Sequence, residues 1–203
     1  EYKIVFAADN GEREIKSTAE EIREQTKGMS LQEKNKYIEE LYLKESKKEN
    51  FMQKQYLANF DVPEGHYYQD VRFLDGTIYK DEQIDLLVGG SPCQSFSVIG
   101  KRGGLEDTRG TLFYEYARIV KECQPKAFIY ENVLGMLNHD KGKTWETINN
   151  VFQSLNYNIK LFKLDAKNYG IPQERRRIFV VGSKVENTMD IPTEIELKTC
   201  LAD

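Results

Sequence analysis

Short apolar runs alternate with longer amphipathic stretches between residues 84 and 181, and this alternation restricts the fold more than any other feature. Short apolar runs are typical of buried strands, whereas apolar residues at helical spacing indicate helices. The alternation predicts an α/β fold with a mostly parallel sheet and helices on both faces. In such sheets, ligands bind outside the carboxyl ends of the strands. We expect strands at 84–88, 127–130, 158–164 and 177–181, and helices at 111–123 and 143–155.

The N-terminal part of the chain has a different character. Residues 3–7 predict a short buried strand, and Asp9-Asn-Gly11 after them is a turn signal. Residues 12–54 then carry ten acidic and ten basic side chains, and Ser30-Leu-Gln-Glu33 has the pattern of a capping box. We expect a charged insertion at about 12–54, made of two solvated surface helices without a chemical role; the alternative is a partner-binding surface.

Composition narrows the class of protein. The chain has 203 residues, enough for one domain with a sizeable core. Three cysteines at irregular spacing argue against a disulfide framework and favour a reducing compartment. The net charge of −4 excludes a generic binder of polyanions, and we find neither a membrane span nor a signal peptide in the pattern. We therefore expect a soluble intracellular protein.

A cysteine follows the strand predicted at 84–88, in the segment Gly89-Gly-Ser-Pro-Cys93. Pro92 fixes its own φ and restricts the residue before it, so this turn can hold a thiol above the edge of the sheet. Because a thiolate is a strong nucleophile, Cys93 is a candidate for covalent catalysis. We expect Cys123 and Cys200 to be structural.

A carboxylate ends the next predicted strand, in Glu131-Asn-Val133. Partial desolvation there favours a protonated carboxyl that can donate a proton. A hydrogen-bonded acid with a purely structural role is the alternative.

Three arginines lead into the last predicted strand, in Gln173-Glu-Arg-Arg-Arg177. Alternation along an extended segment sends Arg175 and Arg177 to one side and Arg176 to the other. The first two can hold a polar ring or a phosphate, or they can be solvated.

The remaining residue types argue against two kinds of chemistry. A cysteine hydrolase normally uses a histidine base, and both histidines, His66 and His139, lie in polar loops. No Cys and His pair has ligand spacing, so we expect no metal. Attack by a thiolate on an electron-poor ring carbon, with an acid to protonate the ring, remains.

These motifs, in this order and spacing, resemble the cytosine-C5 DNA methyltransferase family. The resemblance covers 61–203 well and the first ten residues more thinly. The segments that carry it are Gly90-Ser-Pro-Cys-Gln-Ser-Phe-Ser97, Arg102-Gly-Gly-Leu-Glu-Asp-Thr-Arg-Gly-Thr-Leu112, Glu131-Asn-Val133, Asn168-Tyr-Gly-Ile-Pro-Gln173 and Gln173-Glu-Arg-Arg-Arg177.

The resemblance implies a Rossmann-like fold that binds S-adenosylmethionine, and a role for each motif. Cys93 would add to C6 of a flipped cytosine, while Glu131 would contact ring N3 and the exocyclic amine. Arg177, with Arg175, would hold the base carbonyl and nearby groups. Residues 100–110 would form a loop that closes over DNA, and the residues expected to contact phosphate are Ser97 and Arg109.

The same resemblance assigns a cofactor site. Asp9 would bind the ribose hydroxyls, and Asn10 stands where the family often has an apolar residue that stacks on adenine. Asp70 would contact the adenine amino group. Pro92 and Leu112 would line the methionine side.

By resemblance, residues 1–203 form one catalytic domain with an insertion at about 12–54. The family's opening strand and glycine-rich motif are expected before Glu1, and its target-recognition region after Asp203, so we expect this chain alone to be weakly active or inactive. The expected partners are double-stranded DNA and, in a restriction-modification system, a cognate endonuclease. The expected location is the bacterial cytoplasm.

Two alternatives remain open. One is a tRNA cytosine-C5 methyltransferase of the same superfamily, although its Cys-Phe-Thr signature is not found. The other is a non-catalytic scaffold, which would have no need of Cys93, Glu131 and Arg177.

Overall fold

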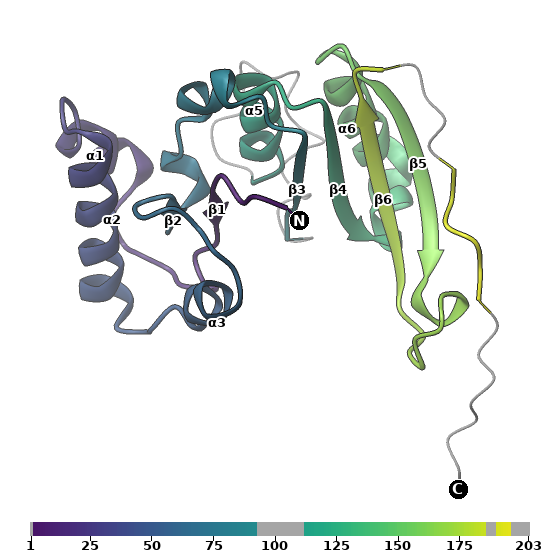
Figure 1. Cartoon of the computed structure of the whole chain (residues 1–203), viewed down its shortest axis with the longest axis horizontal. Coiled ribbons are helices and arrows are strands. Elements are labelled where there is room, and N and C mark those ends of the chain that lie inside the picture. The colour runs from purple at the N-terminus through teal and green to yellow at the C-terminus, as the bar shows by residue number, and fades with distance from the viewer. Residues whose placement is uncertain (1, 93–111, 186–189, 196–203) are drawn as a thin grey trace, which may run out of the picture. The chain divides into compact units, whose positions relative to one another are not determined.

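The computed structural model describes residues 2–92, 112–185 and 190–195. The chain divides into two compact units, Glu1–Asp75 and Gly76–Asp203, and each is described by itself. The charged segment 12–54 is therefore no separate body, because it shares the first unit with the residues on either side of it. Figure 1 shows the elements of both units along the chain.

The first unit contains a two-stranded parallel sheet, β1 (Ala7–Ala8) and β2 (Tyr67–Tyr68), in which Ala7 pairs with Tyr67 and Ala8 with Tyr68. The strand predicted at 3–7 is thus wrong except at Ala7. A strand extends only where a partner supplies hydrogen bonds, and β2 offers two residues. The turn predicted at Asp9-Asn-Gly11 is confirmed, since Oδ1 of Asp9 accepts a bond from N of Gly11, whose φ is +64°.

Three helices follow in the charged segment, where two were predicted. The capping box at Ser30 is confirmed, and a second box, Thr18 with Glu21, starts the first helix in the same way. Asn50 caps the third by accepting a bond from N of Gln53. The helices are α1 (Ala19–Gln25), α2 (Leu31–Ser46) and α3 (Phe51–Asn59).

The charged segment also has a core, which corrects the prediction of a wholly solvated insertion. Ile22 of α1 and Ile38 and Tyr42 of α2 are buried together with Phe73, which lies in the short 3₁₀ helix η1 (Val71–Phe73). The charged side chains cover the outer faces of the helices while these four residues exclude water. The segment therefore packs onto the residues that follow β2.

The second unit is built on a four-stranded sheet in the order β3-β4-β6-β5. β3 runs parallel to β4, whereas β6 is antiparallel to both β4 and β5, so β6 alone of the four is reversed. The loop between β5 and β6 contains no crossover helix, only the 3₁₀ turn η7 (Ala166–Asn168), and such a connection favours antiparallel neighbours. The strands are β3 (Leu86–Gly90), β4 (Ala127–Val133), β5 (Asn158–Asp165) and β6 (Arg176–Ser183).

Two helices, α5 (Leu112–Cys123) and α6 (Lys143–Gln153), pack on this sheet through aromatic rings. The Phe113 ring of α5 lies 5.4 Å from the Phe152 ring of α6, and Phe152 also contacts Phe128 and Tyr130 of β4. Both helices therefore cover the same face, and in the described part of this unit the expected second helical layer is not found. Two right-handed crossovers that proceed in one direction along a sheet place their helices on one side.

The remaining elements of this unit are short. They are the 3₁₀ helices η2 (Gly76–Glu82), η5 (Leu134–Leu137) and η6 (His139–Gly142). Cys123 is buried, as expected, and its Sγ donates to the carbonyl of Gly76. Cys200 lies outside the described residues. No described helix combines the length and the apolar character needed to cross a bilayer.

The strand predicted at 84–88 lies two residues further along the chain, and it is only half buried. Leu87 faces the helices, whereas Leu86 and Val88 are exposed on the opposite face. Among the described residues of this unit, α5 and α6 both pack on the face of Leu87, so the face of Leu86 and Val88 has no helical cover. An apolar run in such a strand does not imply burial on both faces.

Candidate active site

Glu131 and Arg177 form an ion pair between neighbouring strands of the second unit. Nε of Arg177 lies 2.8 Å from Oε1 of Glu131, with side-chain exposures of 23% and 39% respectively. In the antiparallel register Arg177 stands opposite Val133, so the pair is a diagonal contact on one face of the sheet. The structure thus brings together the two charged residues that sequence motifs 46 residues apart had predicted.

The neighbouring arginines have other partners. Arg176 points to β5, where it pairs with Asp165, and it also pairs with Glu174. The predicted alternation between Arg176 and Arg177 is therefore confirmed. Arg175 is exposed, and its backbone N donates to Oδ1 of Asp165. Among the described residues, its side chain does not pair with Glu131.

A buried polar network fixes the backbone immediately before Pro92. Nδ2 of Asn132 donates to the carbonyl of Ser91 at 2.9 Å and to the hydroxyl of Tyr130 at 3.2 Å. The hydroxyls of Ser91 and Tyr130 are 2.6 Å apart. Because unpaired polar groups are costly inside a protein, this closed set defines one position for the Ser91 carbonyl.

The sequence motifs did not predict this network, although Asn132 lies inside the Glu131 motif. The available signal was Asn132 itself, a polar residue on the helix-covered face of β4, between the buried Tyr130 and the end of the strand. Such a side chain needs a partner within reach.

The two glycines before Ser91 allow β3 to pack closely against its neighbours. A Cβ on Gly89 would lie 2.7 Å from the Tyr116 ring, and one on Gly90 would lie 2.8 Å from the carbonyl oxygen of Glu131. Gly90 pairs directly with Glu131 in the parallel register. The end of β3 therefore lies against the strand end that carries the predicted acid.

Cys93, Ser97 and Arg109 lie outside the described residues. Pro92, the last described residue before them, is exposed. Leu112, the first described residue after them, begins α5 and is partly buried.

The first unit brings two other predicted residues to one edge of its sheet. Asp9 directly follows β1, and Asp70 lies two residues beyond β2. N of Asp9 donates to the carbonyl of Tyr68, which continues the parallel pairing. Two carboxylates at the carboxyl ends of adjacent parallel strands are suited to the hydroxyls and amines of a nucleoside.

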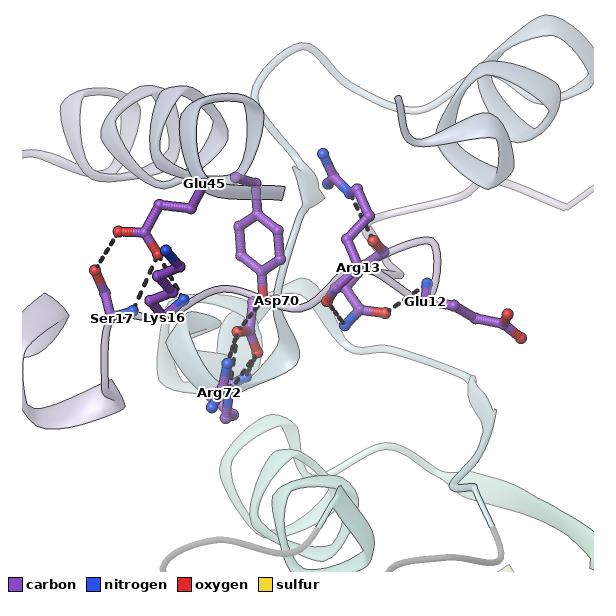
Figure 2. Close-up of polar contacts among 9 residues, drawn as sticks. Glu12, Arg13, Lys16, Ser17, Glu45, Asp70 and Arg72 are labelled. Atoms are coloured by element: carbon purple, nitrogen blue, oxygen red, sulfur yellow. Dashed lines mark hydrogen bonds and ion pairs between the residues drawn. The ribbon is translucent and has the colours of Figure 1, made fainter. Parts of the chain in front are cut away.

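The two carboxylates differ in their surroundings. Asp9 is exposed, and its Oδ1 accepts from N of Gly11. Asp70 is buried, caps η1 by accepting from N of Arg72, and accepts further bonds from the Arg72 guanidinium and the Tyr42 hydroxyl. Figure 2 shows the Arg72 side chain against the Asp70 carboxylate.

Within the described part of the chain, the side chain of Asn10 makes local hydrogen bonds. Its Oδ1 accepts from N of Glu12, and its Nδ2 donates to the carbonyl of Arg13. The amide therefore fixes the turn after β1.

Comparison with known proteins identifies the family. The family model described as C-5 cytosine-specific DNA methylase matches residues 19–200. The chain belongs to this family. The matched range includes both strand ends with the Glu131–Arg177 pair and the segment around Cys93, so the expected family is confirmed.

Curated methyltransferases are similar to this chain. The type II methyltransferase M.HpaII of Haemophilus parainfluenzae is 45% identical over 157 residues, which are 74% of this chain and 43% of the relative. The orphan methyltransferase M.SPRI of Bacillus phage SPR is 47% identical over 129 residues, 64% of this chain and 29% of the relative. This chain thus spans less than half the length of these relatives.

Solved structures confirm the fold class. DNMT2 of Spodoptera frugiperda matches with a TM-score of 0.53 at 22% identity, covering 76% of this chain and 46% of that one. The Entamoeba histolytica methyltransferase EhMeth matches with a TM-score of 0.51 at 15% identity, covering 98% of this chain and 58% of that one. The likeness supports a Rossmann-like methyltransferase fold.

Proposed function

We propose that the protein is a DNA (cytosine-5-)-methyltransferase that transfers a methyl group from S-adenosylmethionine to C5 of a flipped cytosine. The observation that carries this proposal is the Glu131–Arg177 pair, which lies beside the strand that leads into the cysteine turn. An acid and a guanidinium on adjoining strands match the N3, exocyclic amine and carbonyl edge of cytosine.

Cys93 is the nucleophile in this proposal. Its thiolate adds to C6, forming an S–C6 bond and giving C5 the electron density that takes the methyl group. The cofactor, when bound, supplies that methyl as an electrophile. Loss of the C5 proton to a base then restores the double bond and expels the thiolate. The network of Ser91, Tyr130 and Asn132 supports this role by fixing the chain just before Pro92.

Glu131 contacts N3 and the amine of the flipped base, and Arg177 holds both Glu131 and the base carbonyl. Arg175, which lies in the same motif, helps Arg177 to hold the base carbonyl and nearby groups. Extruding the base from the duplex costs a few kcal/mol, which contacts of this kind offset.

In this proposal, separate residues bind the nucleoside part and the methionine part of S-adenosylmethionine. Asp9 binds the ribose hydroxyls and Asp70 contacts the adenine amine, a proposal supported by their positions at one edge of the first unit's sheet. Asn10 stands beside the adenine, and Pro92 and Leu112 line the methionine side.

Double-stranded DNA is the proposed polymer, with Ser97 and Arg109 contacting its phosphates. All of residues 1–203 belong to one catalytic domain in this proposal, and the protein acts in the bacterial cytoplasm. A restriction-modification system with a cognate endonuclease is the proposed setting, because M.HpaII carries a type II name. M.SPRI, in contrast, is named an orphan methyltransferase, so the presence of a cognate endonuclease needs a test of its own.

The test uses the full-length protein, wild type and Cys93→Ala, with cofactor labelled in its methyl group. DNA and tRNA are offered separately. The proposal expects label at C5 of DNA cytosine with the wild type alone. Label in tRNA would favour the tRNA enzyme, and no transfer to either polymer would favour a scaffold.

A further inference from the structure

Tyr42, in the middle of α2, donates a hydrogen bond to a carboxylate that lies far away in sequence. Its hydroxyl is 2.7 Å from Oδ2 of Asp70, 28 residues further along the chain. Tyr42 is 0% exposed and Asp70 5%. The bond is therefore shielded from water, where a hydrogen bond to a charged group is strongest.

The Tyr42 ring is held on several sides. It packs with Ile22, Ile38 and Phe73, and the Arg13 guanidinium lies 4.8 Å from its centroid. Burial, and after it the charge of Asp70, raise the pKa of Tyr42, so its hydroxyl remains a donor over the working pH range.

One turn beyond Tyr42, Glu45 joins α2 to the chain before α1. Its carboxylate accepts bonds from N of Lys16 and from N and Oγ of Ser17, as Figure 2 shows. These contacts fix the position of α2, and with it the direction of the Tyr42 hydroxyl.

Arg72 also contacts Asp70 through its side chain, and it differs from Tyr42 in exposure. Its Nε and Nη2 reach the carboxylate at 2.6–3.0 Å, and its side chain is 32% exposed. The backbone N of Arg72 and the Tyr42 hydroxyl also donate to this carboxylate. Together these donors occupy the positions at which the two oxygens can accept hydrogen bonds. An incoming amine must therefore replace one donor, and the partly exposed guanidinium can leave more readily than the fully buried hydroxyl.

The charged segment also holds the other predicted cofactor acid. Nδ2 of Asn50 donates to the carbonyl of Asp9 at 2.8 Å and to Oε1 of Gln69 at 3.1 Å. Arg13 donates to the same Gln69 oxygen and to the carbonyl of Asn10. Residues of one segment thus contact the backbone after β1 and the carboxylate after β2.

We propose that Tyr42 is a positioning residue of the cofactor site: it keeps the Asp70 carboxylate oriented when the amine of an adenine-bearing ligand replaces the Arg72 guanidinium. The inference rests on the proposed use of S-adenosylmethionine and gives the charged segment a chemical role. Tyr42 touches Asp70 and not the ligand, so its effect is confined to ligands that carry the amine.

Calorimetry on the full-length protein tests this role with two ligands, S-adenosylhomocysteine and S-inosylhomocysteine, which has a carbonyl in place of the amine. Tyr42→Phe removes the hydroxyl and keeps the buried ring. We expect affinity for the adenosyl ligand to fall roughly tenfold, as for loss of a hydrogen bond to a charged group, and affinity for the inosyl ligand to change less than about twofold.

Tyr37→Phe is the matched control, because Tyr37 lies on the same helix and its hydroxyl donates to Gln25, away from Asp70. It should leave both affinities unchanged. Asp70→Asn provides a second background, in which Tyr42→Phe should no longer alter the ratio of the two affinities.

An equal loss for both ligands would make Tyr42 merely structural and overturn the inference, as would no loss for either. If the wild type binds neither ligand, the proposed function fails and the inference fails with it. A wild type that binds the adenosyl ligand, combined with an unchanged ratio in Tyr42→Phe, overturns the inference alone.

Discussion

Nε of Arg177 lies 2.8 Å from Oε1 of Glu131, across two antiparallel strands that are adjacent in the sheet but distant in the chain. The contact holds the Glu131 carboxylate at the end of β4, beside the end of β3. Nε of Arg177 binds the carboxylate, and Nη1 of Arg177 donates to the carbonyl of Arg176. This arrangement fixes the position of the Glu131 carboxylate near the carboxyl ends of β3 and β4.

Replacing Glu131 with Gln keeps the shape of the side chain and removes its charge. We expect methyl transfer to DNA to fall by a factor of about 10² to 10⁴, the usual contribution of a general acid. The free energy of unfolding should change by less than about 1 kcal/mol, because the pair is partly exposed. Initial rates and urea unfolding measure the two effects.

Glu174→Gln is the control for that change. It breaks the exposed ion pair with Arg176 at the start of β6, the strand that carries Arg177, and should leave the transfer rate unchanged. Equal rates for wild type and Glu131→Gln would show that the pair is only structural.

Asn132→Ala removes the donor that holds the Ser91 carbonyl. We expect the free energy of unfolding to fall by about 1–3 kcal/mol, because buried groups lose their partner, and methyl transfer to fall because the turn before Cys93 loses its fixed position. Asn150→Ala, on the exposed part of α6, should stay within about 0.5 kcal/mol of wild type. A fall in stability with an unchanged transfer rate would contradict the positioning of this turn.

Arg72→Gln should have opposite effects on the stability of the fold and on ligand binding at Asp70. The free energy of unfolding should fall by about 1–3 kcal/mol, because a buried carboxylate loses its charged partner. Affinity for S-adenosylhomocysteine should rise, by up to about fivefold, because the ligand amine no longer displaces a guanidinium. Calorimetry that gave a tenfold loss instead would mean that Arg72 itself supports the ligand.

Stability should fall at alkaline pH because of buried tyrosines. Burial raises the pKa of Tyr157 to about 12, and its hydroxyl donates to the carbonyl of Pro125 at 2.7 Å. An unfolded tyrosine has a pKa of about 10. Between about pH 10 and 12 the folded state therefore holds more protons than the unfolded state, and the free energy of unfolding falls as pH rises.

Tyr157→Phe should flatten this dependence. Urea unfolding at about pH 8, 10 and 11 measures it, and Tyr2→Phe, at an exposed position, should reproduce the wild-type curve. An unchanged slope in Tyr157→Phe would show that this hydroxyl does not contribute.

The sequence predicted those parts of the fold and site that depend on local pattern. Strand ends and alternation were sufficient for Glu131 and Arg177, and a capping box located the start of α2. The reversed direction of β6 was not predicted, because strand pattern alone carries no direction.

The contact between Tyr42 and Asp70 was not predictable from pattern. Tyr42 had the spacing of an apolar helix residue, and its role depends on how α2 packs against Phe73, far along the chain. Charge composition indicated a solvated segment, since composition counts the many exposed side chains and not the few buried ones.

Covalent attack by Cys93 on a flipped cytosine is tested most directly by trapping the protein–DNA adduct. With 5-fluorocytosine in the DNA, the step that removes a proton from C5 is blocked, so the S–C6 bond formed by Cys93 should persist. Incubated with cofactor, the full-length wild-type protein should give a protein–DNA species that survives denaturing electrophoresis, and Cys93→Ser should give none. An adduct of equal yield with Cys93→Ser, or none with a wild-type protein that methylates ordinary DNA, would contradict this account.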